Sequence, residues 1–203
     1  MATIFNESTI AANPTGKDAA RAHLITQARV PGTGILLDRL TLGPGGQMRL
    51  AVPPTSVAWL QVLDGRAVLA HGESKDNVSD AHVAFLPPGF SATLTSPAGA
   101  ALLYGEIPDA ARFDANFAHS PPPFRIADWT REPVLDSEHD ARKRVYLVTP
   151  KLFGTKAVKG EMIIYPPGTA AANHHHEGAE HFMFAKVLPA EALAKAGGAD
   201  GGI

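Results

Sequence analysis

Three residues near the C-terminal end of the sequence have the types and spacing of a divalent-metal site. His174 and His176 are separated by one residue, and Glu180 follows four residues after His176. Because successive side chains of a β-strand point to opposite faces, a strand here places both histidines on one face. Glu180 can return to that face after a turn at Gly178. Two imidazoles and one carboxylate form the facial ligand set of non-haem iron and related metals, with positions open for water, dioxygen or a chelating substrate.

The alternative interpretation of this segment is a solvated polar turn whose histidines bind nothing. A single histidine would favour that alternative. Two histidines at strand spacing and a spaced glutamate, all after the turn Pro166-Pro167-Gly168, favour a metal site. The predicted ligands are His174, His176 and Glu180, and the metal is iron, manganese, nickel or zinc. The sequence identifies no catalytic residue beyond them and no residue that binds another cofactor.

The elements that must position this segment are short β-strands. Apolar or alternating runs are separated by turns of Gly, Pro and Asp, because Gly and Asp tolerate positive φ and Pro fixes φ near −65°. Short strands at this spacing are typical of a sandwich or a small barrel. The predicted strands are residues 35–42, 57–63, 66–71, 82–86, 91–95, 101–106, 144–148, 154–158 and 161–165.

The metal segment resembles the first sequence motif of the cupin superfamily. The resemblance rests on Gly168, His174, His176 and Glu180, with five, one and three residues between them, and on the strand-like Phe182-Met183-Phe184 that follows. It implies an all-β cupin barrel, that is, a double-stranded β-helix or jelly roll. It also implies that the two histidines and the glutamate are metal ligands.

The resemblance is incomplete after residue 180. Cupins take a fourth ligand, a histidine, from a second motif that contains Pro-x-Gly, and no such motif follows. His181 is the only later histidine, and its adjacency to Glu180 points it away from the same face. The glycine that usually closes the first motif falls at Val187. The chain therefore carries three ligands of a four-ligand design.

The front half resembles a cupin domain whose metal site has been lost. The closing glycine of the first motif aligns with Gly65, and Pro87-Pro88-Gly89 supplies the Pro-x-Gly of the second motif. The four ligand positions then hold Val52, Pro54, Ala58 and Ala92. This half is expected to be a metal-free barrel, and the whole chain resembles a tandem bicupin with a degenerate first domain.

The second barrel is expected to be incomplete. Composition changes after Phe184, and only a helical or disordered tail follows, so we expect a bicupin shortened by truncation or by a shifted reading frame. Open sheet edges invite pairing with another chain, which predicts a homo-oligomer. The predicted organisation is an N-terminal arm or edge strand (1–33), a degenerate cupin domain (34–106), a linker (107–141), a partial cupin domain with the metal motif (142–187) and a tail (188–203).

The composition and net charge limit the classes of partner and chemistry expected for this protein. The net charge is −2, without the basic face that nucleic acids and anionic membranes require. The sequence has no cysteine, which excludes thiol catalysis and zinc–thiolate sites. No signal peptide and no apolar run of about 20 residues is visible, so we expect a cytoplasmic protein.

Two functions remain open. The first is a metal-dependent oxygenase, isomerase or hydrolase that acts on a small polar substrate, because cupins host many chemistries. The second is a non-catalytic remnant that binds a metal or small ligand, or that only oligomerises. Trp59 and Trp129 are expected to pack in a core or between domains. Surface or hydrogen-bonded positions are expected for His71, His82, His119 and His139.

Overall fold

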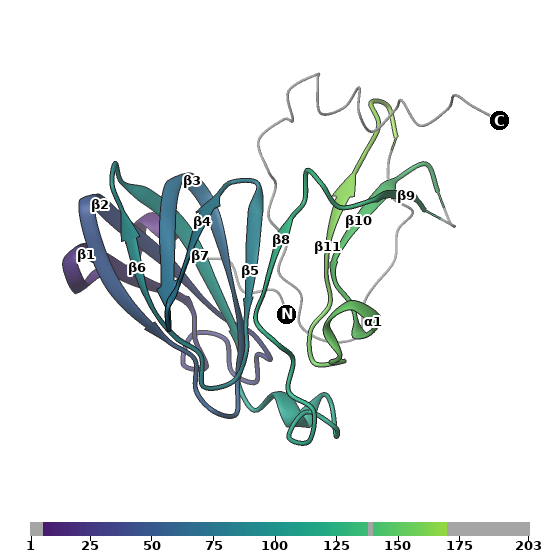
Figure 1. The fold of residues 1–203 in the computed structure, drawn as a ribbon, viewed down its shortest axis with the longest axis horizontal. Helices are drawn as coiled ribbons and strands as arrows, with labels where there is room; N and C mark the ends of the chain where they lie inside the picture. The colour runs from purple at the N-terminus through teal and green to yellow at the C-terminus, as the bar shows by residue number, and fades with distance from the viewer. Residues whose placement is uncertain (1–5, 138–139, 170–203) are drawn as a thin grey trace.

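The computed structural model describes residues 6–137 and 140–169 (Figure 1). Its elements in chain order are η1 (Glu7–Thr9), β1 (Asn13–Ile25), β2 (Leu36–Ala51), β3 (Val57–His71), β4 (Ser74–Ser79), β5 (His82–Leu86), β6 (Ser91–Ser96), β7 (Ala100–Ile107), η2 (Ala110–Arg112), β8 (Arg125–Asp128), β9 (Val134–Asp136), β10 (Lys143–Val148), α1 (Pro150–Phe153) and β11 (Gly160–Ile164). Strands β1 to β8 form one antiparallel sheet, the main sheet, and β9 to β11 form a second, small sheet.

The main sheet folds over into two layers because its long strands change partners along their length. Strand β2 pairs with β7 through residues 36–42 and with β6 through residues 46–51. Strand β3 pairs with β7 through residues 57–65 and with β4 through residues 66–71. One layer therefore contains β7, β5 and β8 with the first halves of β2 and β3. The other contains β6 and β4 with the second halves.

The points where the strands change layer are the glycine-rich segments that the sequence predicts to be turns. Residues 43–46 and Gly65 lie inside continuous strands and form corners between the layers. Gly65 has φ +76°, and Gly99, on the neighbouring turn, has φ +102°. A Cβ on Gly65 would collide with the carbonyl oxygen of Gly99, so the backbones approach more closely than a side chain allows.

One apolar core fills the space between the two layers. Inward-facing residues alternate along each strand, as in Leu40 and Leu42 of β2 or Leu60 and Val62 of β3, and all four are nearly inaccessible to solvent. Full burial of such side chains stabilises the fold by about 1.5–3 kcal/mol each.

The small sheet packs against the outer face of the layer that contains β5 and β8 (Figure 1). Phe85 of β5 lies against Phe153 of α1, with ring centroids 5.3 Å apart. A Cβ on Gly160 would lie 3.5 Å from the Phe85 ring, which shows how closely β11 approaches the main sheet. The two sheets thus share a second apolar cluster.

A buried carboxylate also ties the two parts together. Asp114 Oδ2 accepts hydrogen bonds from the backbone N–H of Lys156 and from the hydroxyl of Thr155, both at 2.8 Å. These bonds, above all the one from the backbone N–H of Lys156, hold the pKa of Asp114 below its usual value.

Several elements differ from the sequence-based expectations. Residues 154–158, predicted to be a strand, follow α1 as an irregular segment whose first residue, Gly154, has φ +74°. Within residues 107–141, predicted to be a linker, β8 pairs with β5. By contrast, the edge-strand alternative for residues 1–33 agrees with the structure, because β1 pairs with β2 at the edge of the main sheet. The division into domains stays a prediction, because residues 170–203 lie outside the described part.

The corner at Gly65 yields a stability prediction. Gly65→Ala is expected to lower the free energy of unfolding by about 3 kcal/mol, because the new methyl group collides with backbone rather than with a movable side chain. Urea unfolding of the purified protein measures this loss.

The matched control is Gly89→Ala. Gly89 also has positive φ, at +70°, but no atom lies within 4 Å of the added Cβ. Only the left-handed conformation then costs free energy, about 1 kcal/mol. Equal losses in the two variants would contradict the close approach at the corner.

Candidate functional site

The predicted metal ligands His174, His176 and Glu180 lie outside the described residues. Among residues 6–137 and 140–169, no three His, Cys, Asp or Glu side chains are grouped as they would be around a metal ion. The metal site therefore stays a prediction from the sequence.

The structure describes the four front-half positions that the sequence aligns with cupin metal ligands. Val52, Ala58 and Ala92 are buried together in the core between the two layers of the main sheet. Pro54 is exposed in the segment between β2 and β3. None of these side chains carries an atom that coordinates a metal, so this part of the interior does not fit a metal ion.

Polar residues line the same interior beside Ala58, and sequence reasoning missed them. We call them the inner polar cluster, which comprises Arg21, His23, Asp38, Ser56, Tyr104 and Glu106. They come from β1, β2, β7 and the segment before β3. Most of them lie two residues along their strand from a core residue, as Asp38 does from Leu40, and so face inward. Glu106 is paired with Ala58 across β7 and β3.

Asp38 is the centre of one half of this cluster. Its carboxylate is buried, and it accepts a 2.7 Å hydrogen bond from Nε of Arg21. Its other oxygen lies 2.7 Å from Nδ1 of His23, whose side chain is 53% exposed. The Arg21 guanidinium lies 4.8 Å from the centre of the Tyr104 ring, which links the two halves of the cluster.

Glu106 is the centre of the other half. It accepts hydrogen bonds from the hydroxyl of Ser56 at 2.8 Å and from the hydroxyl of Tyr104 at 3.1 Å. Burial, and next the charge of Glu106, raises the pKa of Tyr104 well above its usual value. Tyr104 therefore remains a hydrogen-bond donor throughout the neutral range.

The polar groups of this cluster are mostly paired with one another, and the imidazole of His23 is the group that reaches solvent. Asp38 orients the imidazole of His23, as a carboxylate does when it fixes the tautomer of a proton-transferring histidine. Nε2 of His23 has no partner among the described residues and is open to solvent. The sequence contains one signal for this cluster. Asp38 lies at an alternate position with Leu40 and Leu42 on the same strand, so its side chain is expected to point into the core with theirs.

The tryptophans and scattered histidines behave largely as expected. Trp59 packs against the apolar clusters on the outer face of the main sheet, and Trp129 packs against the cluster shared with the small sheet. Their predicted packing role is confirmed. Among the histidines, His71 and His82 hydrogen-bond to nearby side chains, His119 is exposed, and His139 lies outside the described residues.

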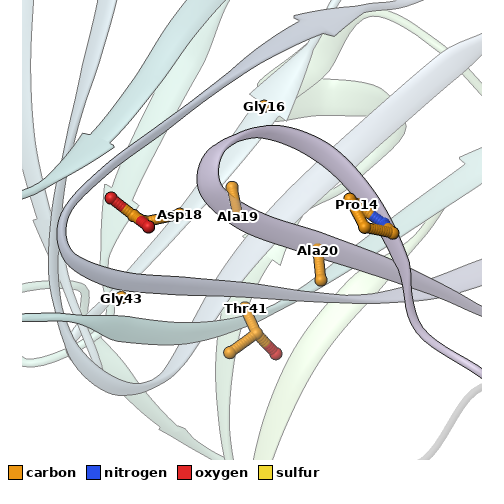
Figure 2. Close-up of a pocket in the computed structure, with 7 residues that line it drawn as sticks. All are labelled: Pro14, Gly16, Asp18, Ala19, Ala20, Thr41 and Gly43. Atoms are coloured by element: carbon orange, nitrogen blue, oxygen red, sulfur yellow. The ribbon is translucent and has the colours of Figure 1, made fainter.

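A shallow hollow of about 310 Å³ lies at the corner of β1 and β2. Figure 2 shows its seven lining residues, of which only Asp18 and Thr41 have polar side chains. Asp18 has φ +44° because β1 changes its register against β2 there. With one carboxylate and one hydroxyl on an otherwise apolar lining, the hollow offers little chemistry.

The inner polar cluster yields a pH prediction. The raised pKa of Tyr104 stabilises the folded state fully below the unfolded pKa of about 10, and this contribution is lost as pH rises above that value. Stability should therefore fall more steeply above pH 10 in the natural protein than in Tyr104→Phe.

Ultraviolet difference absorbance, which reports phenolate, gives a direct check. The phenolate signal of native Tyr104→Phe at alkaline pH should equal that of the native natural protein, because Tyr104 is still protonated in the natural protein and is absent from the variant. After unfolding, the variant should lack the contribution of one of the three tyrosines. A smaller native signal in the variant near pH 11 would contradict the raised pKa.

No helix among the described residues is long and apolar enough to cross a membrane. Neither a family model nor a curated protein sequence matches the chain.

Solved structures are similar at low sequence identity. The protein Ylba from E. coli, described as DUF861, is 12% identical with a TM-score of 0.55, covering 71% of this chain and 57% of its own. A protein from Pseudomonas aeruginosa described as glyoxylate induced is 14% identical with a TM-score of 0.55, covering 69% of this chain and 53% of its own. The chain thus spans little more than half the length of each. Both structures have a cupin fold, and the predicted fold class is confirmed: the chain has an all-β fold of the cupin type. The tandem bicupin arrangement stays a prediction.

Proposed function

We propose that this cupin-domain protein derives from a metal-dependent enzyme (an oxygenase, isomerase or hydrolase) that acts on a small polar substrate. Its metal is bound by His174, His176 and Glu180. The observation that carries the proposal is the contrast between the two halves of the chain. Metal-binding side chains occur at cupin-motif spacing in the second half, whereas the corresponding positions of the first half are apolar, and three of the four are buried.

The donor set suits the proposed metal. Two neutral imidazoles and one carboxylate match the preferences of iron, manganese, nickel and zinc. When bound, such an ion supplies a Lewis acid or a dioxygen-binding centre. The residues of this chain provide the ligands and leave coordination positions for a substrate.

In this proposal the first domain is a scaffold. Val52, Ala58 and Ala92 contribute packing to its interior, and its outer face supports the small sheet through Phe85 and Phe153. Its inner polar cluster is largely paired within itself, which fits a structural part better than an open reaction centre.

The second candidate is a non-catalytic remnant that binds a metal or small ligand, or that only forms a homo-oligomer through open sheet edges. The apolar side chains at the aligned ligand positions of the first domain favour it. Metal content separates a real metal site from a protein that only oligomerises.

Metal analysis of protein purified without added metal tests the proposal. We expect one equivalent of iron, manganese, nickel or zinc per chain, and at least about tenfold weaker metal affinity in His176→Ala, because one of three ligands is removed. Mass spectrometry of the elements, with titration of metal into the chelator-treated protein, measures both.

His119→Ala is the matched control, because His119 is exposed and lies far from the motif in sequence. It should retain the metal. A natural protein without metal, or equal metal loss in the two variants, would contradict the proposed metal site.

The pH dependence of metal binding gives a second test. Histidine must be neutral to coordinate a metal, and its ordinary pKa is about 6.5. Affinity should therefore hold from pH 8 down to about 7 and fall progressively below roughly 6.5. Isothermal titration of the same metal at several pH values measures this, and constant affinity between pH 8 and pH 5 would rule out histidine ligands.

A further inference from the structure

A second hollow of about 310 Å³ lies on the outer side of β3 and β4, and none of its lining residues belongs to the predicted metal motif or to the inner polar cluster. Its lining combines polar side chains with a small apolar surface. It comprises Arg66, Ala67, Val68, Asn77, Val78, Ser79, His82 and Pro97. Concave sites with a few polar groups over an apolar lining are the usual form of small-molecule sites.

The strand register brings the important side chains together. Arg66 is paired with Ser79, and Val68 with Asn77, across β3 and β4. Directly opposed residues on one face of an antiparallel pair have Cβ atoms about 5 Å apart. These four side chains share the outward face, because the residues between them on each strand, such as Ala67, are buried in the core.

Two hydrogen-bond donors in this group lack partners. The guanidinium of Arg66 and the side-chain amide of Asn77 make no hydrogen bond or ion pair with any residue in the described ranges 6–137 and 140–169. Both residues are exposed on the hollow's rim. An arginine without an acidic partner, beside an amide and over an apolar surface, is suited to a carboxylate.

Hydrogen bonds fix the part of the hollow that is lined by Ser79 and His82. Nδ1 of His82 accepts a 3.2 Å hydrogen bond from the backbone N–H of Ser79, and it lies 3.0 Å from the Ser79 hydroxyl. Nε2 of His82 lies 4.0 Å from Asp128. Because the backbone N–H of Ser79 already occupies Nδ1, this contact fixes the turn between β4 and β5 and does not leave the imidazole free to activate the serine.

We propose that this hollow binds a small aliphatic carboxylate. The guanidinium of Arg66 and the amide of Asn77 hold the carboxylate, and the aliphatic part lies on Val68 and Pro97. A single arginine balances one negative charge. A phosphate dianion would need a second cation, and within the described residues no other cation lines the hollow apart from His82 when it is protonated.

The test uses the full chain and butyrate as the probe. Amide NMR spectra recorded during a titration should show saturable shifts at Arg66, Asn77 and Ser79. Butyramide has the same shape without the charge and should bind at least about tenfold more weakly, because the charge-assisted hydrogen bonds are lost.

Arg66→Gln should weaken butyrate binding by a similar factor and remove the difference between butyrate and butyramide. The matched control is Arg49→Gln, an exposed arginine on β2 that faces outward from the same layer. It should bind butyrate like the natural protein. Thermal unfolding confirms that both variants are folded.

Three results would overturn the proposal: shifts that do not saturate, equal binding of butyrate and butyramide, or equal weakening by the two arginine variants. Stronger binding of inorganic phosphate than of butyrate at the same residues would also overturn it, in favour of a general anion site. None of these results bears on the metal site, so the two proposals fail separately.

Discussion

The alternation of side chains along the strands of the main sheet constrains everything inside it. Each strand sends every second residue into the space between the two layers. In β3 a register shift between Val62 and Asp64 precedes the corner at Gly65, and the inward positions change from Leu60 and Val62 to Ala67 and Leu69 as the strand changes layer. Leu40, Leu60 and Ala58 share this space. Because the layers are close-packed, any change at an inward position alters both the packing and the chemistry of the interior.

Polar groups are tolerated inside this sheet because they are paired. Asp38 is buried but accepts a hydrogen bond from Arg21 and lies beside His23. Glu106 accepts hydrogen bonds from the hydroxyl groups of Ser56 and Tyr104. A buried carboxylate without such partners would be strongly destabilising. The interior therefore divides into an apolar part, where cupin ligands would lie, and a polar part whose charges are largely satisfied. The half-exposed imidazole of His23 is where this network meets solvent.

The sequence predicts the strands that alternate clearly and misses those whose residues are mostly polar. Residues 82–86 form β5 as predicted, whereas β4, with the sequence Ser-Lys-Asp-Asn-Val-Ser, has only one apolar residue to mark it. Gly65 in the sequence indicates a change of chain direction. Only the tertiary structure shows that the change is a corner within the continuous strand β3 and not a turn between two strands. The buried Asp38 was missed for a similar reason, since its partners are distant in sequence or on other strands.

The two faces of the main sheet have separate roles, which is consistent with the proposal that the first domain is a scaffold without metal ligands. Inward positions such as Ala58 pack in the core, whereas outward positions such as Phe85 contact the small sheet. Replacement of ligands by apolar residues removes the cost of burying polar groups and leaves the outward face unchanged. The interface with Phe153 and the bonds to Asp114 then still fix the start of the second half. A scaffold thus depends on the outer face alone, and the proposed metal chemistry is assigned to His174, His176 and Glu180 in the other half of the chain.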